Sequence, residues 1–92
     1  MAVEVRIPTI LRTFTSGQKA VTGEGATLSA LIDDIDSRNP GIKGRLVEND
    51  GLRRFVNVYV NDEDVRFSGG LGAPISDGDV VVVLPAVAGG AR

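Results

Sequence analysis

The chain has 92 residues, of which 42% are hydrophobic and 24% charged, so it is long enough for one domain and too apolar to be disordered. Ten Lys and Arg against twelve Asp and Glu give a net charge of −2, which argues against a nucleic-acid binder. Because Cys and His are absent, disulfides, thiolate or imidazole metal ligands and the usual catalytic triads are excluded. We expect no catalysis by this chain alone, and no bound metal or cofactor.

No targeting or membrane segment is visible in the sequence. Glu4 and Arg6 interrupt the apolar residues near Met1, so a signal-peptide pattern is missing. The longest apolar run, residues 80–88, contains Pro85 and is far shorter than the roughly 20 residues that cross a bilayer. We expect a cytoplasmic protein with no membrane partner.

The first elements follow a period of two residues. Residues 3–7 alternate between apolar and charged side chains, which predicts a half-buried strand that ends at Pro8. A weaker strand is expected over about residues 18–22, after the turn signal Ser16-Gly17. Together these two strands predict a hairpin.

A helical period follows. Thr27 is a suitable N-cap, and apolar side chains recur at i, i+3, i+4 and i+7: Leu28, Leu31, Ile32 and Ile35. Pro40-Gly41 predicts that this helix ends by Asn39, and residues 42–47 are compatible with a short helical turn. One amphipathic helix of this kind hides its apolar side by packing on a sheet.

Three further strands are expected after the helix. Residues 55–60 form the first, Asn61-Asp62 a turn, residues 65–67 a short strand and residues 68–74 a loop. Asp77-Gly78-Asp79 is a strong turn signal before residues 80–84, a β-branched run that is apolar on both faces. Such a run fits a central strand covered on both sides, or one whose outer face meets a partner.

Glycine-rich and acidic segments offer no clear chemistry. Residues 23–25 and 69–72 lack the Lys and hydroxyl of a phosphate loop, so tight turns that need positive φ are the favoured interpretation. The acidic clusters at 33–34, 62–64 and 77–79 lie in expected turns or on a solvated helix face. They match neither an acid/base pair in a cleft nor a calcium loop.

One strand suggests a binding surface. If Val56, Val58 and Val60 face the core, the residues that point outward are Phe55, Asn57 and Tyr59. Exposed aromatic side chains mark interfaces, so we predict that these three residues contact a partner. The alternative is that Phe55 packs under a loop at an edge.

The C-terminal segment carries the sharpest signal. We predict a domain over residues 1–85 and a flexible tail over residues 86–92, Ala86-Val87-Ala88-Gly89-Gly90-Ala91-Arg92. Paired glycines have no Cβ and can thread a narrow channel into another protein's active site. The alternative is a frayed end.

The Asp77-Gly78-Asp79 turn, the valine-rich strand, Pro85 and the Gly89-Gly90 tail together resemble the ThiS/MoaD family of sulfur carrier proteins. Residues 7–12 and 55–71 look most like the CysO-type carriers of actinobacterial cysteine synthesis. The resemblance implies an α+β, ubiquitin-like β-grasp fold, with a mixed four- or five-stranded sheet packed on one main helix. The expected strand and helix order agrees with this.

The resemblance also implies a mechanism without catalytic side chains. In that family an E1-like enzyme uses ATP to adenylate the terminal glycine carboxylate, and sulfur then replaces AMP to give a thiocarboxylate. Here the reactive group would be the carboxyl of Gly90, within the tail Ala86, Val87, Ala88, Gly89 and Gly90. A CysO-like carrier passes the sulfur to a PLP-dependent cysteine synthase, and a JAMM-type metalloprotease releases the cysteine.

Ala91 and Arg92 follow the two glycines, so we expect them to be removed on maturation before Gly90 can react. Three other functions stay open at this point. The chain could be the small subunit of molybdopterin synthase, a ubiquitin-like modifier joined to lysines through Gly90, or a plain interaction module.

Overall fold

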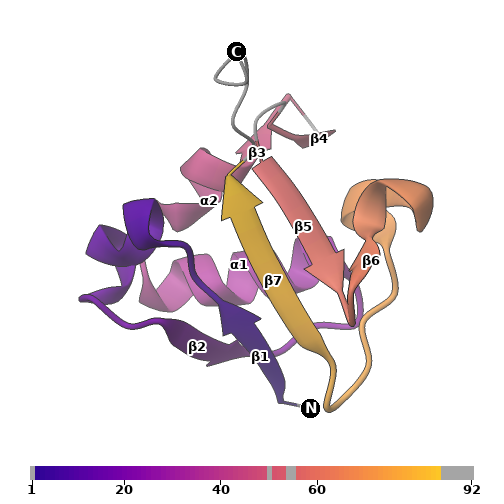
Figure 1. Cartoon of the computed structure of the whole chain (residues 1–92), viewed down its shortest axis with the longest axis horizontal. Helices are drawn as coiled ribbons and strands as arrows, with labels where there is room; N and C mark the ends of the chain where they lie inside the picture. The colour runs from indigo at the N-terminus through magenta and orange to yellow at the C-terminus, as the bar shows by residue number, and fades with distance from the viewer. Residues whose placement is uncertain (1, 50, 54–55, 86–92) are drawn as a thin grey trace.

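A mixed β-sheet forms one layer of the protein and a helix the other (Figure 1). The computed structural model describes residues 2–49, 51–53 and 56–85. Its elements are β1 (Val3–Arg6), η1 (Thr9–Thr15), β2 (Ala20–Gly23), α1 (Leu28–Arg38), α2 (Ile42–Leu46), β3 (Val47–Glu48), β4 (Gly51–Leu52), β5 (Val56–Val60), β6 (Glu63–Asp64), η2 (Val65–Phe67), η3 (Gly70–Gly72) and β7 (Val80–Pro85).

The five strands of the main sheet lie in the order β2-β1-β7-β5-β6. Strand β7 is central, parallel to β1 and antiparallel to β5, while β1–β2 and β5–β6 are antiparallel pairs. Within the described part of the chain only one of its faces is covered, since Val81 and Val83 are buried whereas Leu84 is exposed. The predicted cover on both sides is therefore not observed, and the alternative, an outer face that meets a partner, stays a prediction. Helix α1 covers one face of this sheet (Figure 1). The structure confirms the predicted α+β class, with a mixed sheet of five strands and one main helix.

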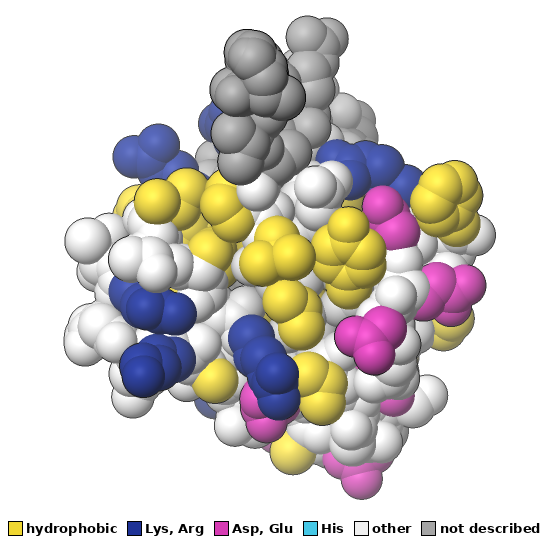
Figure 2. Space-filling model, in the orientation of Figure 1, with side chains coloured by type: hydrophobic (Ala, Val, Ile, Leu, Met, Phe, Trp, Pro, Cys, Tyr) yellow, Lys and Arg dark blue, Asp and Glu magenta, His cyan; other side chains and the backbone are white. Residues whose placement is uncertain are grey.

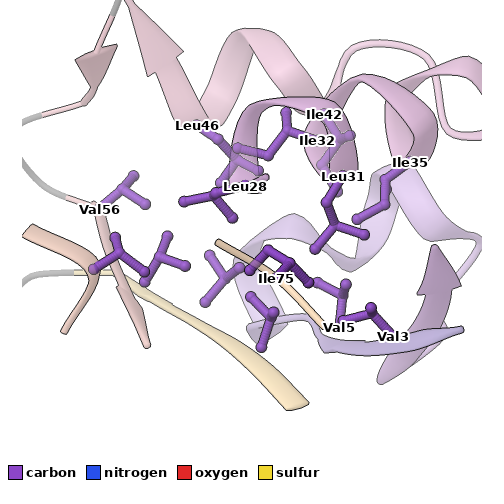
Figure 3. Close-up of a cluster of buried hydrophobic side chains, with 14 of the residues drawn as sticks. Val3, Val5, Leu28, Leu31, Ile32, Ile35, Ile42, Leu46, Val56 and Ile75 are labelled. Atoms are coloured by element: carbon purple, nitrogen blue, oxygen red, sulfur yellow. The ribbon is translucent and has the colours of Figure 1, made fainter. Parts of the chain in front are cut away.

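The core lies between α1 and the sheet (Figure 3). Val3 and Val5 point inward from β1, whereas Glu4 and Arg6 are exposed, which confirms the period-two pattern. All four apolar positions predicted on α1 are buried: Leu28, Leu31, Ile32 and Ile35. Ile42 and Leu46 extend this core from α2, the short helix that the sequence allowed.

Helix α1 begins where the sequence predicts. The Thr27 hydroxyl oxygen accepts a hydrogen bond from the Ala30 backbone N–H at 3.2 Å, and the helix ends at Arg38. Thr27→Ala is therefore expected to lower the free energy of unfolding by about 1 kcal/mol, because an N-terminal donor loses its partner. Urea unfolding measures this change, with Ser29→Ala inside the helix as the control. Equal stability of the Thr27→Ala and wild-type chains would contradict the role of the cap.

Residues 65–67 were predicted to form a strand, and this is wrong. They form the 3-10 helix η2, and the strand that returns beside β5 is the shorter β6. Asn61 and Asp62, with φ of 50° and 73°, form a two-residue turn that pairs Val60 with Glu63 at once. The Asp64 carboxylate then accepts the Arg66 backbone N–H, which turns the chain into η2.

Four further elements were not predicted: η1, β3, β4 and the 3-10 helix η3, which lies inside the predicted loop of residues 68–74. The 3-10 helix η1 lies inside the connection between β1 and β2 and buries Leu11 and Thr15. The strands β3 and β4 form a separate two-stranded hairpin. Strand β2 also begins at Ala20 rather than near Gln18, because η1 and the turn after it occupy the preceding residues.

The glycines of residues 23–25 were expected to supply positive φ, and this is also wrong. Positive φ occurs at Gly69 and Gly70, as predicted for the second segment, but not at Gly23 or Gly25. A Cβ atom on Gly25 would lie 2.4 Å from the backbone nitrogen of Leu31. These glycines are required because the chain passes directly against α1.

Candidate functional site

The sheet face opposite α1 carries a continuous row of side chains. The strand registers place Ala20, Arg6, Val82, Tyr59 and Asp64 side by side from β2 to β6. Residues paired in register project from the same face of a sheet, so this whole row lies on the face that points away from α1. The row is cationic at β1, apolar over β7 and β5, and anionic at β6.

The apolar centre of this face is formed by β7 and β5. Val80 and Val82 are half-buried, Leu84 is 45% exposed, and Tyr59 is half-buried beside them. Figure 2 shows hydrophobic side chains over the middle of this face and most of the visible Asp and Glu toward its right, while Lys and Arg lie toward its left, at its lower centre and at its upper right. Apolar groups ringed by charge are typical of a protein interface. We call this surface, made by the outward side chains of β1, β7, β5 and β6, the outer face.

Two of the three predicted partner-binding residues lie on the outer face. Tyr59 and Asn57 alternate with the buried Val56 and Val58, as the sequence predicts. Phe55 lies outside the described residues.

Asn57 is held by a side chain that the sequence analysis did not single out. The Arg66 guanidinium donates to Asn57 Oδ1 at 2.7 Å, and also to the backbone oxygens of Val56 at 2.6 Å and Arg53 at 3.2 Å. The oxygen of Asn57 is therefore already bonded within the chain, whereas Tyr59 presents its ring on the outer face. Of the two residues, Tyr59 is the better candidate for a contact.

Two exposed apolar residues near the outer face were missed by the sequence analysis. Phe67 is 86% exposed and follows the anchored Arg66, and Ile10 is 66% exposed on η1. Phe67 was assigned to a strand, and its exposure follows from η2, which buries Val65 instead. The signal that could have found it is Asp64 two residues before Arg66, a spacing that suits an Asx cap.

A basic hollow lies at the β1–β2 side of the outer face. It has a volume of about 670 Å³, and its described charged residues are Arg6, Arg12, Lys19 and Glu4, which pairs with Arg6 at 2.8 Å. Its apolar walls are Pro8, Ile10, Val82, Leu84 and Pro85, among others. The hollow therefore reaches the end of β7, the point where the chain continues into the predicted tail.

The tail residues Ala86, Val87, Ala88, Gly89 and Gly90 lie outside the described residues. Strand β7 can be followed to Pro85, which pairs with Val56 of β5. The predicted reactive segment is therefore joined directly to the central strand, at the edge of the outer face.

The Asp77-Gly78-Asp79 motif organises the start of β7. Asp77 Oδ1 accepts the backbone N–H of Ala2 at 2.7 Å, and Gly78 has a φ of 88°. Asp79 Oδ2 accepts the Ser76 N–H at 2.8 Å, and its other oxygen accepts the Asn61 amide at 2.9 Å. Two hydrogen bonds lower the pKa of Asp79: the larger effect comes from the backbone N–H of Ser76, and the smaller from the side-chain amide of Asn61. These contacts assign the motif a structural role.

This pKa shift predicts a pH dependence of stability. Because the folded-state pKa of Asp79 lies below its ordinary value of 3.8, its contribution is present above 3.8 and is lost as the pH falls through the folded-state pKa. Asp79→Asn should therefore destabilise the chain at neutral pH and have little effect once the carboxyl is protonated. Urea unfolding at neutral pH and at a pH below the folded-state pKa of Asp79 measures the loss of unfolding free energy caused by Asp79→Asn. Glu63→Gln, at an exposed carboxylate, is the control. A loss of equal size at both pH values would assign the effect to packing.

In residues 2–49, 51–53 and 56–85, no group of three or more acidic side chains is placed to hold a metal ion. Within the same residues, no helix has the length and hydropathy needed to cross a membrane.

Comparison with known proteins places the chain in a family. The ThiS family matches residues 5–90. The sulfur carrier protein CysO of Mycobacterium tuberculosis is 58% identical over 93 residues, which cover 98% of this chain and all of that protein. The small archaeal modifier protein 3 of Haloferax volcanii is 34% identical over 77 residues, covering 80% of this chain and 84% of that protein.

Solved structures agree with the sequence comparison. A chain in the crystal structure of the Amycolatopsis orientalis BexX/CysO complex superimposes with a TM-score of 0.92 and 63% identity, covering 95% of this chain and 98% of that one. This confirms the ubiquitin-like β-grasp fold that the sequence implied. The family match covers residues 5–90, and the sequence identity with the CysO proteins exceeds one half, so this chain belongs to the ThiS family.

Proposed function

We propose that this chain is a sulfur carrier, not an enzyme, and that it holds sulfur as a thiocarboxylate on Gly90. The observation that carries the proposal is the extent of the family match, which runs through the tail and ends at Gly90. The 58% identity with a protein named as a sulfur carrier over its full length supports the same function. The sequence without Cys and His is consistent with a carrier whose reactive group belongs to the main chain.

The chemistry is supplied by a partner enzyme. An E1-like enzyme uses ATP: the Gly90 carboxylate attacks the α-phosphorus, pyrophosphate leaves and an acyl adenylate forms. Hydrosulfide then attacks the acyl carbon and AMP leaves, so that the carbon–sulfur bond replaces the carbon–oxygen bond to AMP and a thiocarboxylate remains. At neutral pH this group is an anion with a nucleophilic sulfur, for the same reason that a thiolate is reactive. This chain contributes the tail and the outer face that positions it.

Cysteine synthesis is the fate of sulfur that the relatives favour. We propose that a PLP-dependent cysteine synthase accepts the sulfur on an activated serine derivative, and that a JAMM-type metalloprotease cuts the new cysteine from Gly90. The solved complex of a CysO protein supports a protein partner for this chain. The experiment combines thiocarboxylated chain ending at Gly90, cysteine synthase and activated serine, and detects cysteine on the carrier by mass spectrometry. A carrier whose Gly90 stays an unreacted thiocarboxylate in this mixture, without the added mass of cysteine, would contradict the cysteine assignment.

A ubiquitin-like modifier is the second candidate, because one relative at 34% identity is named as a modifier protein. This function joins the Gly90 carbonyl to a lysine amine of another protein through an isopeptide bond. Affinity-tagged chain recovered from its native cell under denaturing conditions distinguishes the two functions. Branched peptides that carry the tail on lysine would support the modifier, whereas carrier found only in unconjugated form would support sulfur transfer.

Tyr59 is the side chain expected to contribute most to recognition by the activating enzyme. Tyr59→Ala should weaken that binding about tenfold, because central aromatic residues supply much of the affinity of an interface. Calorimetric titration measures the affinity, and Thr22→Ala on the outlying strand β2 is the matched control. Stability should fall by only about 1 kcal/mol, since Tyr59 is half-buried and loses one cross-strand contact with Val82. Unchanged affinity would place the interface elsewhere.

A further inference from the structure

A second hollow lies at the end of β7, on the other side of Ile10 from the basic hollow. It has a volume of about 400 Å³, and three of its walls are η1, α2 and the end of the β5–β7 pair. Its apolar lining consists of Pro8, Ile10, Leu11, Phe14, Val56, Val83 and Pro85. Among the residues that the structure describes, its charged lining is Arg45 and Arg53. We call it the tail cleft, since Pro85 lines it and is the last described residue before the tail.

The two arginines of the tail cleft differ in their contacts. Arg53 donates to the backbone oxygen of Gly44 at 2.9 Å and pairs with Glu48 at 3.0 Å. Arg45 stacks over the ring of Phe14, with its guanidinium carbon 5.6 Å from the ring centroid. Among the described residues, Arg45 makes no hydrogen bond and no ion pair. Its N–H donors are therefore available to an anion, and the stacked ring restricts its position.

We propose that the tail cleft is the resting place of this chain's own tail, with the Gly90 carboxylate or thiocarboxylate paired with Arg45. Ala86, Val87 and Ala88 are small and apolar, as are the walls of the cleft. Five residues beyond Pro85 reach about 17 Å when extended, which is enough to cross a hollow of this size. The covalent link also keeps the anion at high effective concentration near Arg45.

The docked tail would protect the product of the activation that the proposed function requires. Hydrolysis of a thiocarboxylate needs water at its acyl carbon and releases sulfide. Apolar walls around the tail and a paired anion limit that attack. A partner enzyme that takes the tail into its own channel replaces the contact with Arg45, so the carrier releases its sulfur only where it is used.

The first test uses the chain that ends at Gly90 in its carboxylate form, without any activating enzyme. The buried core lies within residues 3–83, so we expect the chain that ends at Gly90 to keep the described fold. With a ¹³C label on the Gly90 carboxyl, we expect its pKa to lie about half a unit below that of a tail peptide, the size of an exposed ion pair. Nuclear Overhauser contacts from the Val87 methyls to Phe14 are also expected.

Two matched variants identify the site. Arg45→Gln should return the Gly90 pKa to the peptide value and remove the contacts with Phe14. Lys19→Gln removes the same charge from the basic hollow, the other hollow that Pro85 lines, and should change neither. A Gly90 pKa equal to that of the peptide in the unaltered chain would overturn the proposal, and so would a response to Lys19→Gln alone.

The second test measures the lifetime of the thiocarboxylate. If only the ionised tail docks, a pKa lowered by half a unit means that the free tails are about one third of all ionised tails. Roughly two thirds of the tails are then docked. Arg45→Gln should therefore shorten the lifetime of the loaded carrier about threefold. Docking is measured on the carboxylate form without the activating enzyme, and sulfur loading is measured with it. A chain that docks but is not loaded would contradict the proposed function alone, and a chain that is loaded but does not dock would contradict the tail cleft alone. Equal lifetimes in Arg45→Gln and the unaltered carrier would contradict the protective role.

Discussion

A chain that ends at Gly89 should gain almost no sulfur from the activating enzyme, whereas the chain that ends at Gly90 is loaded. Removing one residue withdraws the carboxylate by about 3.3 Å from the adenylating site. A displacement of even 1 Å can cost a factor of about 10² in rate. We therefore expect loading to fall by about 10² or more, as measured by mass spectrometry after incubation with enzyme, ATP and a sulfur donor.

The thermal midpoint provides the control for this variant. The buried core lies within residues 3–83, so the chains ending at Gly89 and at Gly90 should unfold at nearly the same temperature, apart from the few degrees that a pairing of the Gly90 carboxylate with Arg45 would contribute. A chain that ends at Ala91 should also fail to load, because its carboxylate is displaced in the opposite direction. Equal loading of all three chains would contradict the assignment of Gly90.

Gly25→Ala is expected to have the largest effect on stability. The added Cβ would lie 2.4 Å from the Leu31 nitrogen and 2.8 Å from the carbonyl carbon of Ala30, both of which are backbone atoms of α1. A helix backbone cannot yield as the end of a flexible side chain can. We expect the free energy of unfolding to fall by about 3 kcal/mol, the upper range of overpacking, measured by urea unfolding.

Gly44→Ala is the matched control for Gly25→Ala. Gly44 lies inside α2, and a Cβ there would have no neighbour within 4 Å. The same substitution should stabilise the chain by about 0.5–1 kcal/mol, because Ala loses less backbone entropy in a helix than Gly. Destabilisation of the same size at both positions would show that the close approach at Gly25 is not the cause.

The elements that could be predicted are those with a clear period or cap. The alternation over residues 3–7, the apolar spacing of α1 and the Thr27 cap each reflect the local chain geometry, and each was confirmed. Local propensity and tertiary packing agree in these elements.

The features that were missed depend on contacts between distant residues. Gly25 is required by the backbone of α1, which no local turn preference reveals. Residues 65–67 have the composition of a strand, but the two-residue turn at Asn61-Asp62 ends the pairing before they are reached. The tail cleft brings Phe14, Arg45 and Pro85 together from η1, α2 and β7, and only the folded chain shows this.

The outer face could be predicted only in part. Period two placed Tyr59 and Asn57 on the side opposite Val56 and Val58, as the structure confirms. The sequence did not show that Arg66 binds Asn57, because that contact joins η2 to β5. The role of Tyr59 in binding stays a prediction, and so do the roles of Phe55 and of the tail.

The location of the sulfur tests the account most directly. The chain that ends at Gly90 is incubated with its E1-like partner, ATP and a sulfur donor, digested, and its C-terminal peptide is sequenced by tandem mass spectrometry. The account predicts that one carboxyl oxygen of Gly90 is replaced by sulfur and that every side chain is unmodified. Sulfur on any other group, or no sulfur on Gly90 after full incubation, would contradict it.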